Sequence, residues 1–239
     1  MNHLSLFTGA GGGELGAILN GWHTVGYVEW DEYCQRVLAQ RIKDGILPEA
    51  PIFGDVRAFI SEGYAEAYQG LVDVISAGFP CQPFSTASRG RRTAKDFWPD
   101  TREVIKRVRP SFILAENVSK RAIEDAALDL WADGYHPQIA KVSAADLGAD
   151  HLRARYWVFA HADLQGELSG AVDAKVAGVP GVCPRVWEGY SSERGMDDGL
   201  AYRVDRLKAI GNGQVPAVVR AVWKLMQCDS QSGCSKSDY

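Results

Sequence analysis

The sequence contains few cysteines and no long apolar run, and both absences exclude classes of protein. Its five cysteines are odd in number and include no Cys-x-x-Cys pair, so neither a disulfide framework nor a zinc site is expected and no metal is predicted. No stretch of about 18 apolar residues is present to form a transmembrane helix. The first residues, MNHLSLFTGAGGG, lack the basic and apolar regions of a signal peptide. A cytoplasmic protein is therefore expected.

An excess of positive charge is also missing. Lys and Arg number 26 against 30 Asp and Glu, and the formal net charge is −4. A protein with this balance is not held to nucleic acid by its overall charge, so any such contact depends on local basic patches. The run SRGRRTAKDF offers one, with Arg89, Arg91, Arg92 and Lys95. It suits a hinged loop over a phosphate backbone, and a plain solvated loop is the competing interpretation.

Before His161, short apolar runs alternate with amphipathic stretches, which is the pattern of an α/β fold. The predicted strands are HLSLF, TVGYVE, LVDVISAG, SFILAEN and RYWVFAH, at residues 3–7, 24–29, 71–78, 111–117 and 155–161. The predicted helices begin near Glu14, Glu32, Thr101 and Arg121. The apolar runs at 72–77 and 112–115 lack polar alternation, as expected of strands covered on both faces of a sheet.

The composition changes after His161. Residues 163–202 are rich in Gly, Pro, Ser and Asp without a sustained period, which predicts a loop-rich insertion. Order returns at Arg203, where AVVRAVWKLM predicts a closing amphipathic helix. We therefore divide the chain into a main domain at 1–162, an insertion at 163–202, a return to the main domain at 203–228 and a polar tail at 229–239.

A glycine-rich turn follows the first predicted strand. LSLFTGAGGGELG reads as a strand, a turn and the start of a helix, and glycines there permit positive φ and close approach of a ligand. The spacing is not GxGxxG, because Glu14 stands where the third glycine belongs. The turn alone therefore does not separate a ligand site from a tight connection.

Three residues near successive strand ends favour a ligand site. Glu29 can accept hydrogen bonds from two ribose hydroxyls, Trp30 can cover an adenine face, and Asp55 can accept from the adenine amine. Each has a structural alternative. Glu29 is otherwise a solvated strand end, Trp30 partly buried core and Asp55 a helix N-cap. Their order after a glycine turn favours the ligand.

A cysteine and a carboxyl group follow two strands that are predicted to be buried. Cys81 lies in GFPCQPFS, a turn whose prolines restrict the backbone. Buried cysteines are usually inert packing, but these neighbours are turn residues, which favours a reactive thiol. Glu116 ends the strand SFILAENV, and the two groups suggest a nucleophile and an acid. Arg153 and Arg155 in HLRARYW are expected on one strand face, with a solvated face as the alternative.

Together these motifs resemble the DNA (cytosine-5) methyltransferase family. FTGAGGG resembles its cofactor motif, GFPCQPFS its catalytic motif, ENV at 116–118 its acid-bearing motif, HLRAR its Gln-x-Arg-x-Arg motif and RLKAIGNGQVP its C-terminal motif. The motifs keep the family's order and cover nearly residues 4–225. GFPCQPFS with a downstream ENV is the most specific part.

The resemblance implies transfer of a methyl group from S-adenosylmethionine to carbon 5 of cytosine in DNA. The implied fold is a Rossmann-like methyltransferase sheet with helices on both faces and a small loop-rich insertion. The implied catalytic residues are Cys81, Glu116, Asn117, Arg153 and Arg155. The implied cofactor-binding residues are Phe7, Thr8, Gly9, Gly11, Gly12, Glu29, Trp30, Asp55, Val56, Gly78, Pro80 and Asn212.

The resemblance also implies a mechanism. The Cys81 thiolate adds to carbon 6 of a base flipped out of the duplex, as methyltransferases of nucleobases require. Glu116 bonds N3 and the exocyclic amine, which suits a pKa raised by burial. Arg155 bonds the cytosine carbonyl and Arg153 a flanking phosphate. The implied setting is a monomer on double-stranded DNA in a bacterium or phage-infected cell, in restriction and modification, without metal or membrane.

Two departures from the family pattern affect these expectations. His151 stands where the family usually has Gln, which affects the residue expected to make a supporting hydrogen bond but neither arginine. The interval at 163–202 is short for a target-recognition domain, so a short target is expected. The candidate base readers are Arg185, Trp187, Tyr190 and Arg194.

Two alternative functions are left open. The first is the same chemistry on transfer RNA cytosine, where a small recognition segment suits an RNA read by its shape. The second is a catalytically inactive DNA-binding module. That alternative predicts loss of a chemical residue, whereas Cys81, Glu116, Arg153 and Arg155 are all present.

Overall fold

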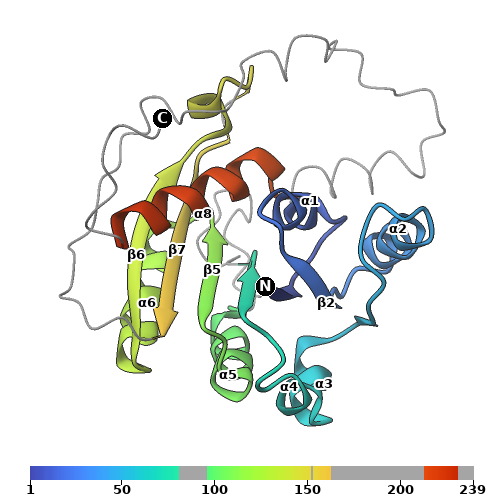
Figure 1. Ribbon diagram of the computed structural model, residues 1–239. Helices are drawn as coiled ribbons and strands as arrows, with labels where there is room; N and C mark the ends of the chain where they lie inside the picture. Colours follow the sequence, from blue (N-terminus) through green and yellow to red (C-terminus); the bar gives the residue numbers. More distant parts are fainter. Residues whose placement is uncertain (81–95, 152, 163–212, 231–239) are drawn as a thin grey trace, which may run out of the picture.

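The computed structural model describes residues 1–80, 96–151, 153–162 and 213–230. Within these ranges the strands form a seven-stranded sheet of order β3-β2-β1-β4-β5-β7-β6 (Figure 1). The strands are β1 (Asn2–Leu6), β2 (His23–Val28), β3 (Ile52–Phe53), β4 (Val74–Ala77), β5 (Phe112–Asn117), β6 (Tyr135–Val142) and β7 (Arg155–Ala162). β1 to β5 pair in parallel, whereas β7 runs antiparallel to both β5 and β6.

Helices cover both faces of this sheet. One face carries α1 (Gly12–Leu19), α2 (Glu32–Lys43) and α8 (Pro216–Ser230), and Figure 1 shows α8 crossing in front of the strands beside α1. The other face carries α3 (Val56–Ser61), α4 (Tyr64–Ala67), α5 (Trp98–Val108) and α6 (Lys120–Ala132). The predicted α/β fold class, a Rossmann-like sheet covered on both faces, is confirmed.

The alternation of side chains along β5 separates two apolar layers. Ile113 and Ala115 belong to the core under α5 and α6, whereas Leu114 belongs to the core that α8 covers. Because strand side chains alternate with a period of two, Glu116 shares the face of Leu114. The carboxyl group at the end of β5 therefore lies on the α8 side of the sheet.

Helix α8, from the C-terminal part of the described chain, packs closely against α1, from the N-terminal part. A Cβ at Gly16 would lie 2.6 Å from Cβ of Val219 and 2.9 Å from the Pro216 carbonyl oxygen. No larger residue fits there without displacement of a helix. This contact places the residues that precede α8 against the glycine-rich turn.

The predicted elements are found, and two strands were missed. All five predicted strands and the four predicted helices are present, and the closing helix is α8. The helix expected near Thr101 begins earlier, at Trp98, because Pro99 suits a first turn. β3 is only two residues long. β6 mixes buried and half-buried positions and contains Pro137, which is tolerated because β6 is an edge strand.

The insertion at 163–202 and the tail from 231 lie outside the described residues. Among the helices of the described ranges, none is long and apolar enough to cross a membrane.

Candidate active site

The glycine-rich turn leaves β1 through an unusual backbone conformation. Phe7 has φ 56°, Gly9 φ 61° and Gly11 φ 86°. A bulky residue rarely adopts positive φ, and such positions cluster at ligand sites. Thr8 holds the turn against β2 through its backbone N–H, which donates to the Val28 carbonyl at 3.2 Å. Over Gly9 a Cβ would meet nothing within 4 Å, so the turn has open space beside it.

Glu29 closes this turn and does not project into solvent. Its Oε2 accepts from the Gly9 N–H at 2.6 Å and its Oε1 from the Asp31 N–H at 2.7 Å. The residue is 8% exposed, so the interpretation of Glu29 as a solvated strand end is wrong. The glycine turn and the end of β2 therefore form one unit around a buried carboxylate.

Trp30 and Asp55 differ from each other in exposure and role. Trp30 is 73% exposed, so the interpretation as partly buried core is wrong and the indole is accessible to a flat ligand. Asp55 accepts from the Arg57 N–H at 2.9 Å and caps α3, which confirms the N-cap interpretation. The cap uses one carboxylate oxygen, and Val56 beside it is buried.

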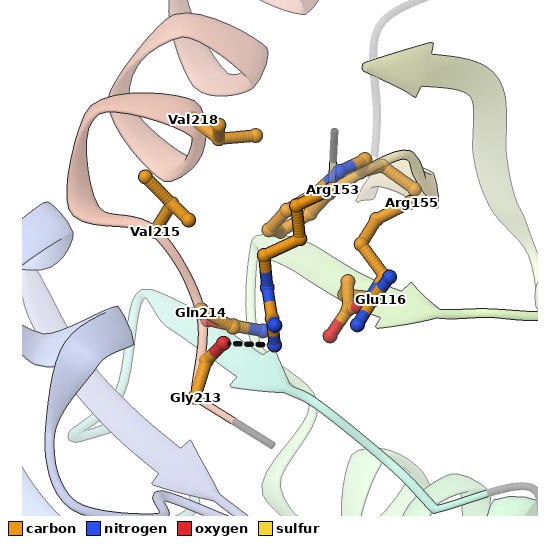
Figure 2. Close-up of a pocket in the computed structure, with 8 residues that line it drawn as sticks. Glu116, Arg153, Arg155, Gly213, Gln214, Val215 and Val218 are labelled. Atoms are coloured by element: carbon orange, nitrogen blue, oxygen red, sulfur yellow. Dashed lines mark hydrogen bonds and ion pairs between the residues drawn. The ribbon is translucent and has the colours of Figure 1, made fainter. Parts of the chain in front are cut away.

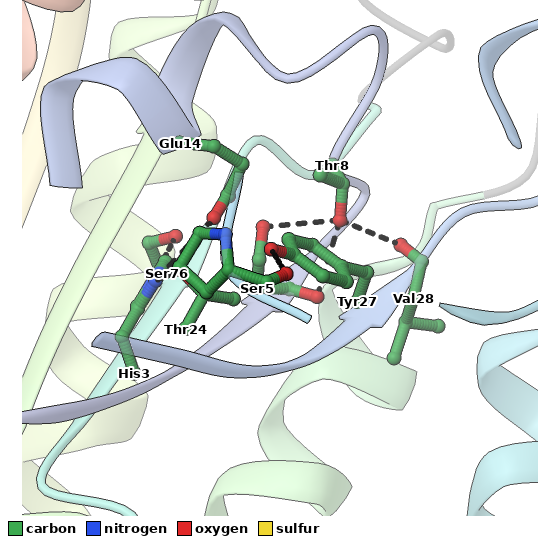
Figure 3. Close-up of polar contacts among 9 residues, drawn as sticks. His3, Ser5, Thr8, Glu14, Thr24, Tyr27, Val28 and Ser76 are labelled. Atoms are coloured by element: carbon green, nitrogen blue, oxygen red, sulfur yellow. Dashed lines mark hydrogen bonds and ion pairs between the residues drawn. The ribbon is translucent and has the colours of Figure 1, made fainter. Parts of the chain in front are cut away.

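A buried polar network lies behind the turn (Figure 3). His3 Nδ1 is 3.0 Å from Thr24 Oγ1, and His3 Nε2 is 2.7 Å from Ser76 Oγ. Thr24 donates in turn to Glu14 Oε2 at 2.8 Å. The network joins β1, β2 and β4 to the first turn of α1, and it fastens the helix that the glycine turn begins.

This network has the residue types of a hydrolytic triad but no access for a substrate. His3 is 0% and Glu14 1% exposed. Burial lowers the pKa of His3, although the nearby Glu14 opposes this, so the neutral form of the ring is favoured. The network was missed by the sequence analysis. Its signal was the placement of His3 and Ser76 within strands that are otherwise apolar.

A second cluster lies across the sheet, at the ends of β5 and β7 (Figure 2). Arg155 Nε is 2.9 Å from Glu116 Oε1, and Arg153 donates to the Gly213 carbonyl oxygen. These side chains line a small pocket together with Trp157, Gly213, Gln214, Val215 and Val218. The alternative of a solvated arginine face is wrong for Arg155, whose side chain is 21% exposed and paired.

Burial controls the charge state of Glu116. The residue is 8% exposed, and desolvation raises the pKa of its carboxyl group. The positive charges of Arg155 and Arg153 and a hydrogen bond from Gln214 oppose that rise without cancelling it. A carboxyl group that keeps its proton at higher pH beside two guanidinium groups is suited to proton donation.

Arg153 reaches the pocket from a different position than expected. The ladder of β7 begins at Arg155, so Arg153 does not share a strand face with it. The Arg153 N–H instead donates to Ser143 Oγ at 3.4 Å, which draws the chain out of the ladder. The two side chains still converge on one pocket, because Arg153 approaches from the side of Gly213.

Asn117 holds the turn that leads to Cys81. Its Nδ2 donates to the Phe79 carbonyl at 2.9 Å, and its Oδ1 accepts from the Ser119 N–H at 2.9 Å. A Cβ at Gly78 would lie 3.6 Å from Glu116 Oε2, so the Gly78–Pro80 turn borders the acid. Cys81 follows Pro80 directly in the sequence and lies outside the described residues.

Several other predicted residues also lie outside the described ranges. They are Asn212, the basic run Arg89, Arg91, Arg92 and Lys95, and the base readers Arg185, Trp187, Tyr190 and Arg194. Gln214 was absent from the predicted set although it lines the pocket. It is part of the GNGQVP motif, but no local pattern indicated its contacts.

Comparison with known proteins settles the family. A model of the C-5 cytosine-specific DNA methylases matches residues 1–176. The chain belongs to this family. Type II methyltransferase M.NgoMIV of Neisseria gonorrhoeae is 30% identical over 164 residues, covering 64% of this chain and 49% of that protein. M.HpaII of Haemophilus parainfluenzae is 31% identical over 170 residues, covering 65% and 44%. This methylase chain thus spans about half the length of these relatives.

Solved structures share the fold of this methylase. DNMT2 of Spodoptera frugiperda superposes with a TM-score of 0.54 at 17% identity, covering 72% of this chain and 53% of the other. Dnmt2 of S. pombe gives 0.53 at 20% identity, covering 70% and 51%. At these identities the likeness concerns the fold alone.

Proposed function

We propose that this methylase transfers a methyl group from S-adenosylmethionine to carbon 5 of cytosine in double-stranded DNA. The observation that carries the proposal is the buried Glu116, paired with Arg155 and bordered by the turn that leads to Cys81. The names of the type II methyltransferase relatives support DNA as the substrate. We assign catalysis to residues 1–162 and 203–228, and target recognition to residues 163–202.

The residues around the glycine turn fit S-adenosylmethionine, which when bound supplies a methyl group on an electrophilic sulfonium. The open space over Gly9 and the strained Phe7 form a cradle for a ligand. Glu29 is a buried carboxylate at the end of β2, a group that can accept from ribose hydroxyls, and the exposed Trp30 can cover an adenine face. We assign binding also to Thr8, Gly11, Gly12, Asp55, Val56, Gly78, Pro80 and Asn212.

In the proposed reaction Cys81, as a thiolate, forms a bond to carbon 6 of a flipped-out cytosine. Electron density then moves through the ring toward carbon 5 and N3. Glu116, whose pKa is raised by burial, donates its proton to N3 and stabilises that charge. Arg155 orients Glu116 and bonds the cytosine carbonyl, and Arg153 contacts a flanking phosphate. Carbon 5, made nucleophilic by the addition, would take the methyl group that S-adenosylmethionine supplies. Loss of the carbon 5 proton to solvent then breaks the carbon 6–sulfur bond and restores the thiolate, and N3 returns its proton to Glu116.

Trapping on DNA that contains 5-fluorocytosine tests this proposal. Fluorine leaves no proton to remove from carbon 5, so the protein should stay bonded to the base. We expect an adduct that survives denaturing electrophoresis and that accumulates efficiently only with S-adenosylmethionine. Cys81→Ser should abolish it, whereas Cys34→Ala, at a buried cysteine on α2, should retain it.

Two further arms complete this test. Glu116→Gln should slow trapping strongly and leave DNA binding intact, because it removes the titrating group and keeps the shape of the side chain. Methylation measured in parallel on duplex DNA and transfer RNA identifies the nucleic acid. Trapping that persists in Cys81→Ser would show that the nucleophile is wrong, and methylation of transfer RNA alone would overturn the DNA substrate.

A further inference from the structure

Gln214 lies where two separate turns approach each other. A Cβ at Gly12 would lie 2.3 Å from the Gln214 carbonyl oxygen, and a Cβ at Gly13 would lie 2.4 Å from Gln214 Oε1. A Cβ at Gly78 would lie 3.2 Å from Gln214 Nε2. The glycine-rich turn and the turn before Cys81 therefore both lack side chains where they face one residue. That residue comes from the opposite end of the described chain.

The same side chain also reaches the acid. Gln214 and Glu116 line one pocket, and the nearby Gln214 amide lowers the pKa of the Glu116 carboxyl group. Figure 2 shows the Gln214 side chain extending from the segment before α8 toward the tips of Arg153 and Glu116. Because a carboxylate accepts hydrogen bonds, the amide nitrogen faces Glu116 and the amide oxygen is left on the side of Gly13.

The backbone of Gln214 is held on both sides. The preceding residue, Gly213, accepts a hydrogen bond from Arg153. The following helix, α8, packs against Gly16 of α1 with no room for a Cβ between them. The position of the Gln214 backbone is therefore a consequence of the packed fold.

We propose that Gln214 is a positioning residue that couples the cofactor-binding turn to Glu116. Its amide oxygen end sets the position of Gly13, and its amide nitrogen end orients the carboxyl group that faces the base. An amide suits this place because it offers a donor and an acceptor without charge. Leucine offers neither group, and glutamate replaces the donor with a second negative charge. The inference rests on the proposed function.

The pH dependence of the reaction reports this coupling. A hydrogen bond to the charged form lowers the pKa of a carboxyl group, and Gln214 has that effect on Glu116. Loss of the amide therefore raises the pKa of Glu116 further. Because protonated Glu116 is the proposed active form, the alkaline limb of the pH–rate profile should move to higher pH.

The experiment compares Gln214→Leu and Gln214→Glu with the wild type. The control variant is Gln40→Leu, at a glutamine on α2 whose side chain makes an exposed hydrogen bond to Asp44. We measure methylation rates against pH at saturating substrates, and S-adenosylmethionine affinity by calorimetry. Both Gln214 variants should move the alkaline limb upward by about one pH unit, which corresponds to the loss of one hydrogen bond to a charged group. S-adenosylmethionine should also bind several-fold more weakly, and the control should match the wild type.

The outcomes separate the inference from the function on which it rests. An active wild type whose Gln214 variants keep both the pH profile and the cofactor affinity overturns the role of Gln214 alone. A wild type that neither methylates nor is trapped overturns the proposed function. Gln214→Glu, close to the native size, decides the matter if the leucine variant fails to fold.

Discussion

Replacement of Gly16 by alanine tests the packing on which the site depends. The new Cβ would lie 2.6 Å from Cβ of Val219 and 2.9 Å from the Pro216 carbonyl, both far inside normal contact distance. Overpacking of this kind typically costs about 1–3 kcal/mol, whereas alanine gains about 1 kcal/mol over glycine within a helix. We expect a net loss of unfolding free energy of about 1 kcal/mol.

A double-mutant cycle with Val219→Ala isolates the contact. Val219 is 1% exposed, so its truncation alone also destabilises the protein through a cavity. In the double mutant the alanine at position 16 gains room, and we expect a favourable coupling of about 1 kcal/mol. Urea denaturation of the four proteins measures it, and a coupling near zero would refute the reasoning. Because Gln214 lies two residues before α8, Gly16→Ala should also weaken S-adenosylmethionine binding, and Val219→Ala should partly restore it.

Three other predictions follow from the site, the core and the insertion. Glu29→Ala should weaken S-adenosylmethionine binding by about 1–3 kcal/mol, the scale of hydrogen bonds to a charged group; unchanged affinity in a folded variant, measured by calorimetry, argues against the ribose assignment. Burial lowers the pKa values of His3 and His161 in the folded protein. As the pH falls below 6.5, the ordinary pKa of histidine, these two residues therefore take up protons in the unfolded chain before they do so in the folded chain. Unfolding free energy should therefore be level above that pH and fall below it, and His161→Phe should flatten the decline in denaturation series; an unchanged slope contradicts this. The short insertion predicts a target of about two to four base pairs, and a methylation map with a single site of six or more pairs would overturn it.

Arg153, Arg155 and Asp55 show which features of the site local sequence patterns can predict and which they cannot. HLRARYW predicted a strand with paired arginines, and the strand is present. The position of Arg153 outside the ladder was not predictable, because it depends on Ser143, which lies in another segment. The N-cap role of Asp55 depends only on its carboxylate and the Arg57 N–H two residues later, so the sequence could offer it as an alternative to ligand binding.

Burial separated the competing interpretations that the sequence had left open. Glu29 and Trp30 are neighbours in the chain, yet one is 8% and the other 73% exposed. Adjacent side chains of a strand point to opposite faces, but the sequence does not say which of the two side chains is buried. That depends on the glycine turn, whose Gly9 N–H binds Glu29.

The sequence by itself was sufficient for the strands, the glycine turn and the acid at the end of β5, because these follow from short-range periodicity and from residue types at short spacings. The family was indicated by the resemblance of its motifs. Packing alone established that Gln214 lies against Gly12, Gly13 and Gly78 and lines one pocket with Glu116. Residues from the two ends of the described chain meet there only because α8 docks on α1 at Gly16. Such contacts arise from the complementary shapes of whole helices, which no local stretch of sequence encodes.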